Sequence, residues 1–516
     1  MLEHTTPIDR LIVARFLPRV VSACLLALLA ACSAALPERT APVPLPERFV
    51  EAAGLDAIGK DAIGRDAVGS DAVGSDALGS EAGLTLWRRL DDPVLAALVD
   101  QALARNLSLA QASARLDAAR ALRDQASFAL FPVIGTSAAR NRSRASSDDP
   151  FVPPGLGVID NYQAGFDASW EIDLFGRARA ARRAVVAGAD AAVADVAAAR
   201  LSIAAEVAQA YFSLRGEQSR LGVQQRQVTN LTENLRLLEL RRDAGRGTEL
   251  DVARSNALGL AIAANLPLTE AAIARAEQRL AVLTVSSVAQ LRSELGAARP
   301  IPMLAGSLPL GDPEEWLRRR PDVRAAHARL RAAEAEVGVR YADWFPRLTL
   351  TGGFGWTAPS ASGLGDSAAE RWNFGPSLSW RILDFGQVRQ EVRASRARAA
   401  EALAAWQQSV LLALEEVEGA LANYRGTLRS AAALEQAVVR AGDALAIAKL
   451  RFDAGAADTL VVLDAERTLL DLENQFASAA IARATALAAV YKALAGDFIA
   501  PPERDRADTP SPKANP

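Results

Sequence analysis

A strict alternation of apolar and polar residues marks three segments of the chain. Between positions 162 and 172, and again between 372 and 382, apolar or small residues occupy the even positions, while polar residues or glycine occupy the odd ones. Residues 347–356 keep the same period of two, and the stretch after Pro132 follows it less clearly. Segments of about ten residues with aromatic side chains near their ends are typical of outer-membrane strands, which face lipid on one side and water on the other. A soluble hairpin with one face on a core remains the alternative.

Two much longer segments follow the predicted strands. Residues 177–244 and 387–453 contain no proline and are rich in Ala and Leu, which favour helix. At 1.5 Å per residue, each helix would reach roughly 100 Å. Gly245 and Gly455 end the two runs as C-cap glycines, and Thr248 and Asp458 stand where returning helices would begin. Pro267 interrupts the first return path. Each half of the chain therefore predicts a long helical hairpin.

These elements belong to a structural repeat that occurs twice in the chain. The matching motifs are Phe175-Gly176 with Phe385-Gly386 and Asp243-Ala244-Gly245 with Asp453-Ala454-Gly455, at an offset of 210, and Phe131-Pro132 with Phe345-Pro346, at an offset of 214. Each repeat begins with a helix whose N-cap Asp is followed by Pro, at Asp92 and at Asp312. We therefore predict a mixed α and β membrane protein with a two-fold internal repeat, residues 85–296 and 297–500.

The amino terminus resembles the signal of a bacterial lipoprotein. Three arginines precede an apolar run of about 12 residues, which is too short to span a bilayer. The run ends in Leu29-Ala30-Ala31-Cys32, which resembles a lipobox, so we expect residues 1–31 to be removed and Cys32 to be lipidated. An uncleaved signal with an incidental Cys is the alternative. No later segment shows the long charge-free run of a membrane helix, so we expect any membrane crossing to use strands.

Residues 32–84 are interpreted as a flexible tether. A proline-rich stretch leads into five pentads of the type Asp-Ala-Ile-Gly-Lys at positions 56–80, and this period matches neither helix nor strand. A binding role for the pentads, for example toward cell-wall polymer, remains open. Residues 501–516, rich in proline and charge, are predicted to be a disordered tail.

Composition argues against catalysis and against nucleic acid. The formal net charge of −3 gives no basic surface for a polyanion. The chain has only two Cys and two His, so a metal or thiol site would have to be built almost entirely from carboxylates. His327 stands alone on a predicted helix, and no phosphate-binding loop or nucleophile elbow is present. The carboxylates Glu415, Glu416 and Glu418 are interpreted as part of a helix face whose charge is balanced by nearby arginines. We predict neither enzyme activity nor a cofactor or bound metal.

Four strands cannot close a barrel, and open strand edges are not tolerated in lipid. A ring of identical copies solves this problem, and three copies would supply 12 strands, which is enough for an aqueous bore.

Several motifs in this order resemble the outer-membrane factor family, the TolC-like channels of tripartite export systems, and in particular its NodT-type lipoprotein branch. The resemblance covers about residues 85–500 and rests on Asn106-Leu107-Ser108-Leu109, Arg319-Arg320-Pro321-Asp322, Phe345-Pro346-Arg347-Leu348, Leu378-Ser379-Trp380, Glu415-Glu416-Val417-Glu418 and Leu460-Val461-Val462-Leu463-Asp464-Ala465. It implies a trimeric 12-stranded β-barrel in the outer membrane, continued by a long periplasmic α-helical barrel. It also implies a periplasmic adaptor protein and an inner-membrane efflux transporter as partners.

The resemblance also implies which residues close and dock the channel. The periplasmic gate would use Leu460 and Asp464, with Asp251 joining at the tips; one carboxylate ring or several would serve. A solvated carboxylate near the helix start is the plainer interpretation of Asp464. The adaptor would dock at the tip residues Gly245, Gly247, Thr248, Gly455 and Asp458, which are equally suited to be ordinary helix caps.

Two alternatives remain open. The channel would conduct small molecules such as drugs, solvents or metal ions, or it would serve as an exit duct for secreted proteins. A lipid-anchored periplasmic coiled-coil scaffold explains the helices, but not the alternating strands rich in Trp and Phe. The sequence names neither the exported substrate nor the particular pump.

Overall fold

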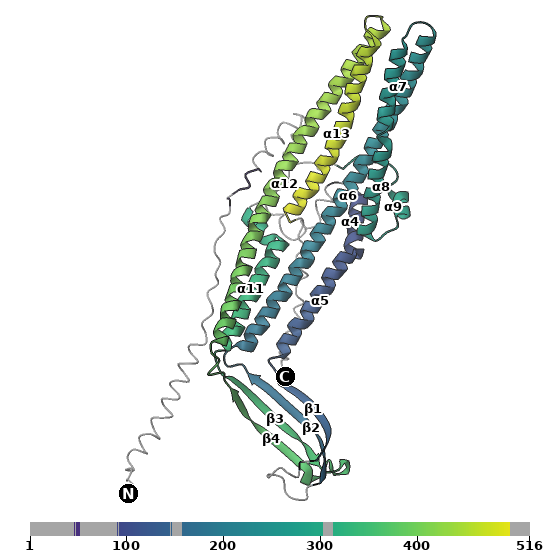
Figure 1. Cartoon of the computed structure of the whole chain (residues 1–516). Helices are drawn as coiled ribbons and strands as arrows, with labels where there is room; N and C mark the ends of the chain where they lie inside the picture. Colours follow the sequence, from purple (N-terminus) through teal and green to yellow (C-terminus); the bar gives the residue numbers. More distant parts are fainter. Residues whose placement is uncertain are drawn as a thin grey trace, which may run out of the picture. The chain divides into compact units, whose positions relative to one another are not determined.

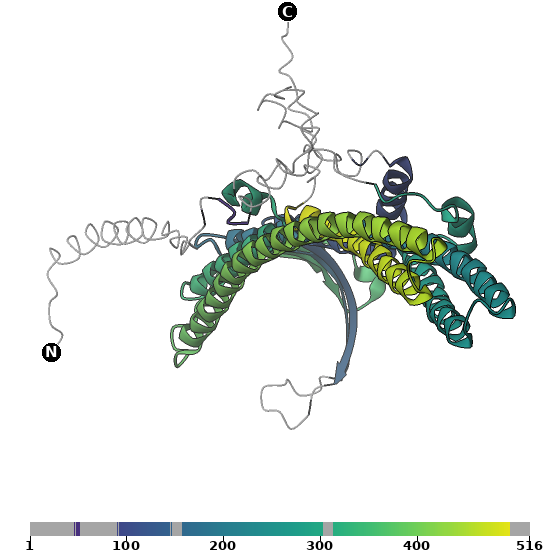
Figure 2. The same ribbon diagram turned by 90° about the horizontal axis from the view of Figure 1, so that it is seen from above.

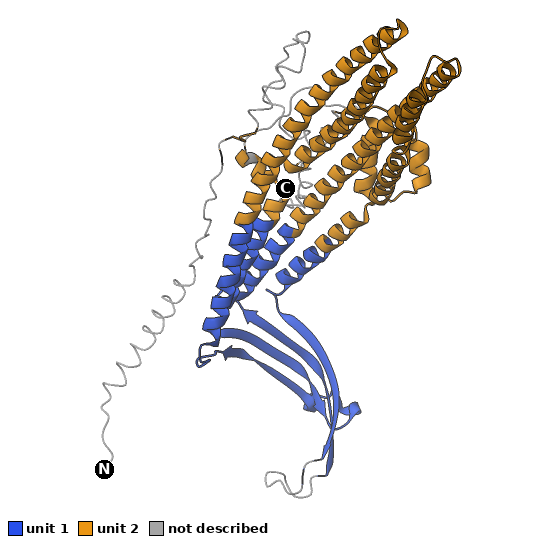
Figure 3. Cartoon of the chain, turned by 45° about the horizontal axis from the view of Figure 1, so that its top comes forward, with its two compact units in different colours: residues 1–42, 117–191, 326–406 blue, residues 43–116, 192–325, 407–516 orange. Residues whose placement is uncertain are grey.

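The computed structural model describes residues 46, 48–51, 90, 92–144, 146, 157–302 and 313–495. Its elements, in chain order, are α4 (Pro93–Arg105), α5 (Leu107–Phe128), β1 (Val133–Arg144), β2 (Val158–Ile172), α6 (Arg177–Asp243), α7 (Glu249–Ala263), α8 (Leu266–Thr284), α9 (Val288–Leu295), α10 (Pro313–Arg319), α11 (Pro321–Ala342), β3 (Arg347–Ala358), η2 (Ala361–Gly363), η3 (Ser367–Ala369), β4 (Glu370–Ser379), α12 (Gln387–Asp453) and α13 (Thr459–Ala493) (Figure 1). The chain divides into two compact units, and the division falls within helices α5, α6, α11 and α12 (Figure 3). Each unit is described by itself.

The first unit is built on a single antiparallel sheet of four strands in the order β1-β2-β3-β4 (Figure 1). The strands of this sheet are curved (Figure 2). Phe166 lies opposite Phe354, and Phe354 lies opposite Trp372, so these three aromatic side chains share one face. Asp167, Gly353 and Asn373 form the next row and lie on the other face. The sheet therefore has an apolar face and a polar face, as the alternation in the sequence predicts.

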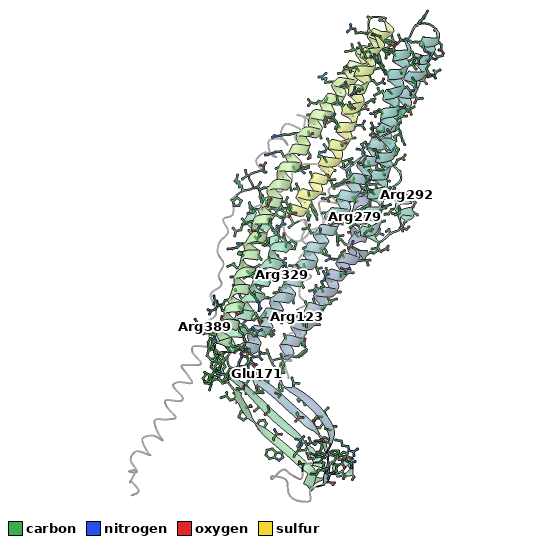
Figure 4. All side chains as sticks on the ribbon, viewed as in Figure 1. Arg123, Glu171, Arg279, Arg292, Arg329 and Arg389 are labelled. Atoms are coloured by element: carbon green, nitrogen blue, oxygen red, sulfur yellow. The ribbon has the colours of Figure 1, made fainter. Side chains whose placement is uncertain are left out.

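Each hairpin of the sheet is joined to its helices by a fixed corner. The indole Nε1 of Trp170 donates to the carbonyl of Leu130 at 2.9 Å, and Trp380 Nε1 donates to the carbonyl of Trp344 at 3.1 Å. Glu171 accepts two hydrogen bonds from Arg177 at the start of α6. Glu171 and Arg389 both lie where the helices of this unit meet the strands (Figure 4). The strands therefore enter the helices through short, hydrogen-bonded connections.

The two halves of the chain use the same elements at constant offsets. An offset of 214 carries α5 onto α11 and β1 onto β3, and an offset of 210 carries α6 onto α12. Strand β4 departs from the repeat, because it ends at Ser379, whereas the alternation predicted a strand as far as Ile382. Among the residues that the structure describes, 380–382 have no ladder partner, and a strand is defined by its partner as much as by its own pattern.

The second unit has a core built from several helices. Leu95, Val207, Leu280, Leu421 and Val490 are all essentially buried in one cluster to which α4, α6, α8, α12 and α13 contribute. The predicted helix start at Asp92 is confirmed, since its Oδ1 accepts from the backbone N–H groups of the first turn of α4. The expected single helix up to Pro132 is divided at Asn106, whose side-chain oxygen accepts from the first turn of α5. The equivalent Asp312 lies outside the described residues.

A short segment near the amino terminus is also fixed to this core. Phe49 is buried there, and the Glu418 carboxylate on α12 accepts hydrogen bonds from the backbone N–H groups of Val50 and Glu51. Arg425 forms an ion pair with the Glu51 side chain. These residues fall within the range 32–84 that the sequence predicts to be a flexible tether. Their sequence has no periodic pattern that would predict a fixed position, because contacts with the distant helix α12 hold them in place.

One described stretch, Glu249–Thr284, is long and apolar enough to cross a membrane by length and composition alone. This corrects the expectation that no later segment has such a run. The stretch is two helices, because α7 ends at Ala263 and α8 begins at Leu266, with Pro267 in its first turn. Glu277 of α8 is buried and pairs with Arg292 of α9 at 2.7 Å, which ties α8 to the helical body.

Candidate gate and docking tips

The two long helices end in turns of the same geometry. Gly245 and Gly455 both have φ of +70°, which is the left-handed conformation that glycine adopts without strain. Beyond each glycine, the N–H of Arg246 donates to the carbonyl of Arg241, and that of Ala456 donates to Arg451. These bonds define a Schellman cap and show that the tip glycines have a structural role.

The caps of the returning helices differ between the two tips. Thr248 and Asp251 form a reciprocal capping box at the start of α7, with Thr248 Oγ1 at 2.7 Å from Asp251 Oδ2. Asp458 occupies the equivalent N-cap position before α13, but its side chain makes no capping hydrogen bond. Gly247 lies close to the helix end, because a Cβ there would lie 3.0 Å from the N atom of Arg242. The carboxylate of Asp251 is therefore held by its own helix cap.

Leu460 and Asp464 lie one turn apart on an exposed face of α13. Leu460 keeps 48% of its surface exposed, and Val461 beside it is equally exposed. Arg467, which the sequence analysis missed, continues the same face, so a cation follows the carboxylate by three residues. The structure thus brings two of the three predicted gate residues together on one face, with Asp251 on a different hairpin.

The opposite face of α13 is attached to α6 by polar side chains. Asn234 Nδ2 donates to both oxygens of Glu466 at 2.9 and 3.0 Å, and Gln227 Nε2 donates to Glu473 at 2.7 Å. Burial raises the pKa of Glu466, although Lys449 and the Asn234 hydrogen bond oppose the shift. Sequence reasoning missed this seam, because a lone Glu on a long amphipathic helix looks like an exposed residue.

The predicted lipidation site Cys32 and the pentads at 56–80 lie outside the described residues, as does the tail at 501–516. Among the described residues, no group of His, Cys, Asp and Glu has the number of members needed to hold a metal ion.

The arrangement defines a class of protein. A sheet with one apolar and one polar face fits a wall between lipid and water. The same chain carries two helices of 67 residues that end in exposed tips, and the returning helix α13 has an exposed leucine and a carboxylate on one face. This combination is that of an outer-membrane channel subunit.

Comparison with known proteins gives the family. The model of the family described as "Outer membrane efflux protein" matches residues 98–284 and 313–496. The outer membrane protein OprJ of Pseudomonas aeruginosa is 33% identical over 79% of this chain and 85% of its own length. Nodulation protein T of Rhizobium leguminosarum is 27% identical and covers 95% of this chain and 94% of its own length. The structure of the outer-membrane channel OprN superposes with a TM-score of 0.80 at 37% identity, covering 89% of this chain and 98% of that one.

The chain belongs to the outer membrane efflux protein family. This confirms the recognised family and the predicted class of function, an outer-membrane efflux channel rather than an enzyme. The mixed fold with four strands and long helices per chain is confirmed as well.

Proposed function

We propose that the protein is a homotrimer whose three sheets close a 12-stranded barrel in the outer membrane, continued by a periplasmic barrel of helices. The observation that carries the proposal is the four-stranded sheet itself, with its apolar face and its two open edges. Open edges do not persist in lipid, and cyclic assembly removes them. Cys32 with its acyl chains would add a lipid anchor in the same membrane.

The periplasmic end would open and close at α13. Three copies of Leu460 brought together at a constriction would exclude water, and three copies of Asp464 one turn away would repel each other and favour cations. Asp251 would contribute through the tip of the first hairpin. The turns around Gly245, Gly247, Thr248, Gly455 and Asp458 are proposed as the surface that docks a periplasmic adaptor protein, which links the channel to an inner-membrane efflux transporter. Small molecules would then pass passively to the exterior.

The test is single-channel conductance of the purified protein in a planar bilayer, with the oligomeric mass measured in parallel. The wild type is expected to be a trimer with small, cation-preferring steps. Asp464→Ala, and more strongly Asp464→Ala with Leu460→Ala, should enlarge the steps by loosening the closed end. Asp443→Ala removes an exposed carboxylate on α12 instead and serves as the matched control.

Unchanged conductance in both gate variants would place the constriction elsewhere. A monomer that inserts no channel would reject the barrel and favour the periplasmic scaffold.

A further inference from the structure

The sheet of the first unit ends in two strands that each have one partner. Within the described ranges, β1 pairs with β2 alone and β4 pairs with β3 alone. In the proposed barrel, the edge of β4 in one copy must meet the edge of β1 in the next. The internal repeat specifies how they meet, since the chain already contains one joint of this kind, between β2 and β3.

The equivalence of the two repeats holds at the level of single hydrogen-bonded pairs. The offset of 214 carries Val133 onto Arg347 and the offset of 210 carries Ser169 onto Ser379, and both pairs lie directly opposite in their hairpins. The two corner contacts of Trp170 and Trp380 described above obey the same offsets. Positions in the strands of one repeat can therefore be transferred to the strands of the other with single-residue accuracy.

The joint inside the chain has two components. The last three residues of β2, Trp170 to Ile172, pair only with Leu350, Thr349 and Leu348 of β3. Just beyond them, the ring of Phe175 stacks on Phe345 with centroids 4.7 Å apart and planes at 11°. Offset stacking of this kind adds to the apolar area that the rings bury.

The equivalent residues at the outer edges have no such partners within the described part of one chain. Phe385 corresponds to Phe175 and is 93% exposed, while Phe131 corresponds to Phe345 and is 65% exposed. Residues 380–382 correspond to 170–172, and they are the residues by which β4 falls short of the predicted strand. Ile382 and Ile134, which the offsets place opposite each other, are also exposed apolar side chains.

We propose that β4 pairs with β1 of a second copy in the register of the internal joint, with Ser379 opposite the second copy's Ser137. Residues 380–382 then complete β4 by pairing with residues 136, 135 and 134 of the second copy. Phe385 stacks on Phe131 of that copy as Phe175 stacks on Phe345. The proposal rests on the trimer described under the proposed function and adds its register and its aromatic contact.

The equivalence has a limit in the helices. A Cβ on Gly338 of α11 would lie 3.3 Å from the Cβ of Ala180 on α6, so these helices approach closely. The equivalent positions between copies are Asp124 and Gln390, which are larger and polar. The helices must therefore lie farther apart there, and the amide of Gln390 can donate to the Asp124 carboxylate. The apolar component of the joint is confined to the strands and the two phenylalanines.

Cysteine cross-linking tests the register in the full-length chain. Ser137→Cys combined with Ser379→Cys places two thiols directly opposite across the proposed joint, and each change is nearly isosteric. Oxidation in native membranes should give covalent dimers and trimers that disappear on reduction. Ser169→Cys combined with Thr351→Cys is the matched control, because these residues are opposite within one chain and should cross-link without a change of mass.

The register is tested by moving one of the two cysteines along β4. Ser137→Cys combined with Ser377→Cys keeps both thiols on the same face but two residues out of register. It should cross-link several-fold less than the first pair, and a preference for it would overturn the proposed register. A conducting trimer that cross-links in neither pair would refute the joint and leave the channel intact. A conductance-free monomer would refute both.

The aromatic contact is tested by a double-mutant cycle on trimer dissociation by heat in detergent. Phe385→Ala and Phe131→Ala should each increase the monomer fraction, and the double variant should be no worse than the more damaging single one. Phe354→Ala, on the central strand β3, controls for loss of an exposed aromatic ring. Strictly additive effects of the two joint variants would show that the rings do not meet.

Discussion

Removal of the Arg320 side chain should destabilise the second unit strongly. The guanidinium, 8% exposed, lies between α10 and α11. Its Nε and Nη2 donate to both oxygens of Asp322 at 3.0 and 2.7 Å, and Nη2 also donates to Glu416 on α12 at 2.6 Å. Its Nη1 donates to the carbonyl of Ala493 at the end of α13, also at 2.6 Å. One side chain therefore links three separate segments of the chain.

The size of the effect follows from what is left behind. Arg320→Met keeps much of the volume but leaves two carboxylates and a carbonyl without their donor. The carboxylates of Asp322 and Glu416 are 46% and 39% exposed, so water replaces part of the lost interaction. We therefore expect a loss of about 3 kcal/mol in the free energy of unfolding, at the low end for a broken buried ion pair. Arg318→Met, on the exposed face of α10, should change it by less than about 0.5 kcal/mol.

Urea denaturation in detergent, followed by circular dichroism of the helices, measures the difference. Burial raises the pKa of Asp322, but the hydrogen bond and charge of Arg320 outweigh it, so the pKa is lowered overall. A lowered pKa means that this contribution is present above the ordinary carboxyl pKa, about 4, and is lost as the pH falls through the folded value. The difference in the free energy of unfolding between Arg320→Met and wild type should therefore become smaller only at acidic pH. A loss below about 1 kcal/mol at neutral pH would refute this reasoning.

Two further changes test buried polar groups in the same unit. Tyr211 is buried, and its hydroxyl donates to Asp92 Oδ2 at 2.6 Å. Burial, and to a smaller extent the hydrogen bond to Asp92, raises the pKa of Tyr211 to about 12. The phenol therefore stays protonated and remains a donor. Tyr211→Phe should lower the urea midpoint by an amount equivalent to about 1–2 kcal/mol, whereas an unchanged midpoint would show that the bond is not needed. Because the pKa of Glu466 is raised, its contribution is fully present below the unfolded value and falls as the pH rises through the folded one. Glu466→Gln should therefore raise the melting temperature at pH 7.5 relative to wild type, with the advantage vanishing near pH 4; a lower melting temperature at pH 7.5 would contradict this.

The elements that local chemistry determines could be predicted closely. The starts of α6 at Arg177 and of α12 at Gln387 follow the Phe-Gly corners as predicted. Helix α6 ends at Asp243, one residue before the predicted end, and α12 ends at the predicted Asp453. These boundaries depend on propensity, glycine and capping residues, which are all readable within one turn. The end of β4 was predicted wrongly at Ile382, because a strand end depends on the neighbouring strand rather than on the pattern alone.

The candidate site was predictable only in part for the same reason. The family resemblance pointed to Leu460 and Asp464, which lie on an exposed face of α13, and the tip caps could be placed from Gly245 and Gly455. The partner of Glu466 could not be predicted, since Asn234 lies more than two hundred residues earlier in the sequence. Residue type alone does not tell a buried glutamate from an exposed one, because burial is decided by the fold.

The two faces of α13 place opposite demands on one helix. A gate needs Leu460 and Asp464 at a fixed height, yet α6 and α13 are rich in alanine and leucine, and such surfaces pack almost as well after a shift of one turn. The amide–carboxylate pairs Asn234–Glu466 and Gln227–Glu473 disfavour such a shift, because a shift of one turn would leave the buried carboxylate of Glu466 and the half-buried one of Glu473 without these donors. An apolar seam would be as stable or more stable. The polar seam is therefore better explained as the feature that fixes the register of α13, and with it the height of the proposed gate residues Leu460 and Asp464.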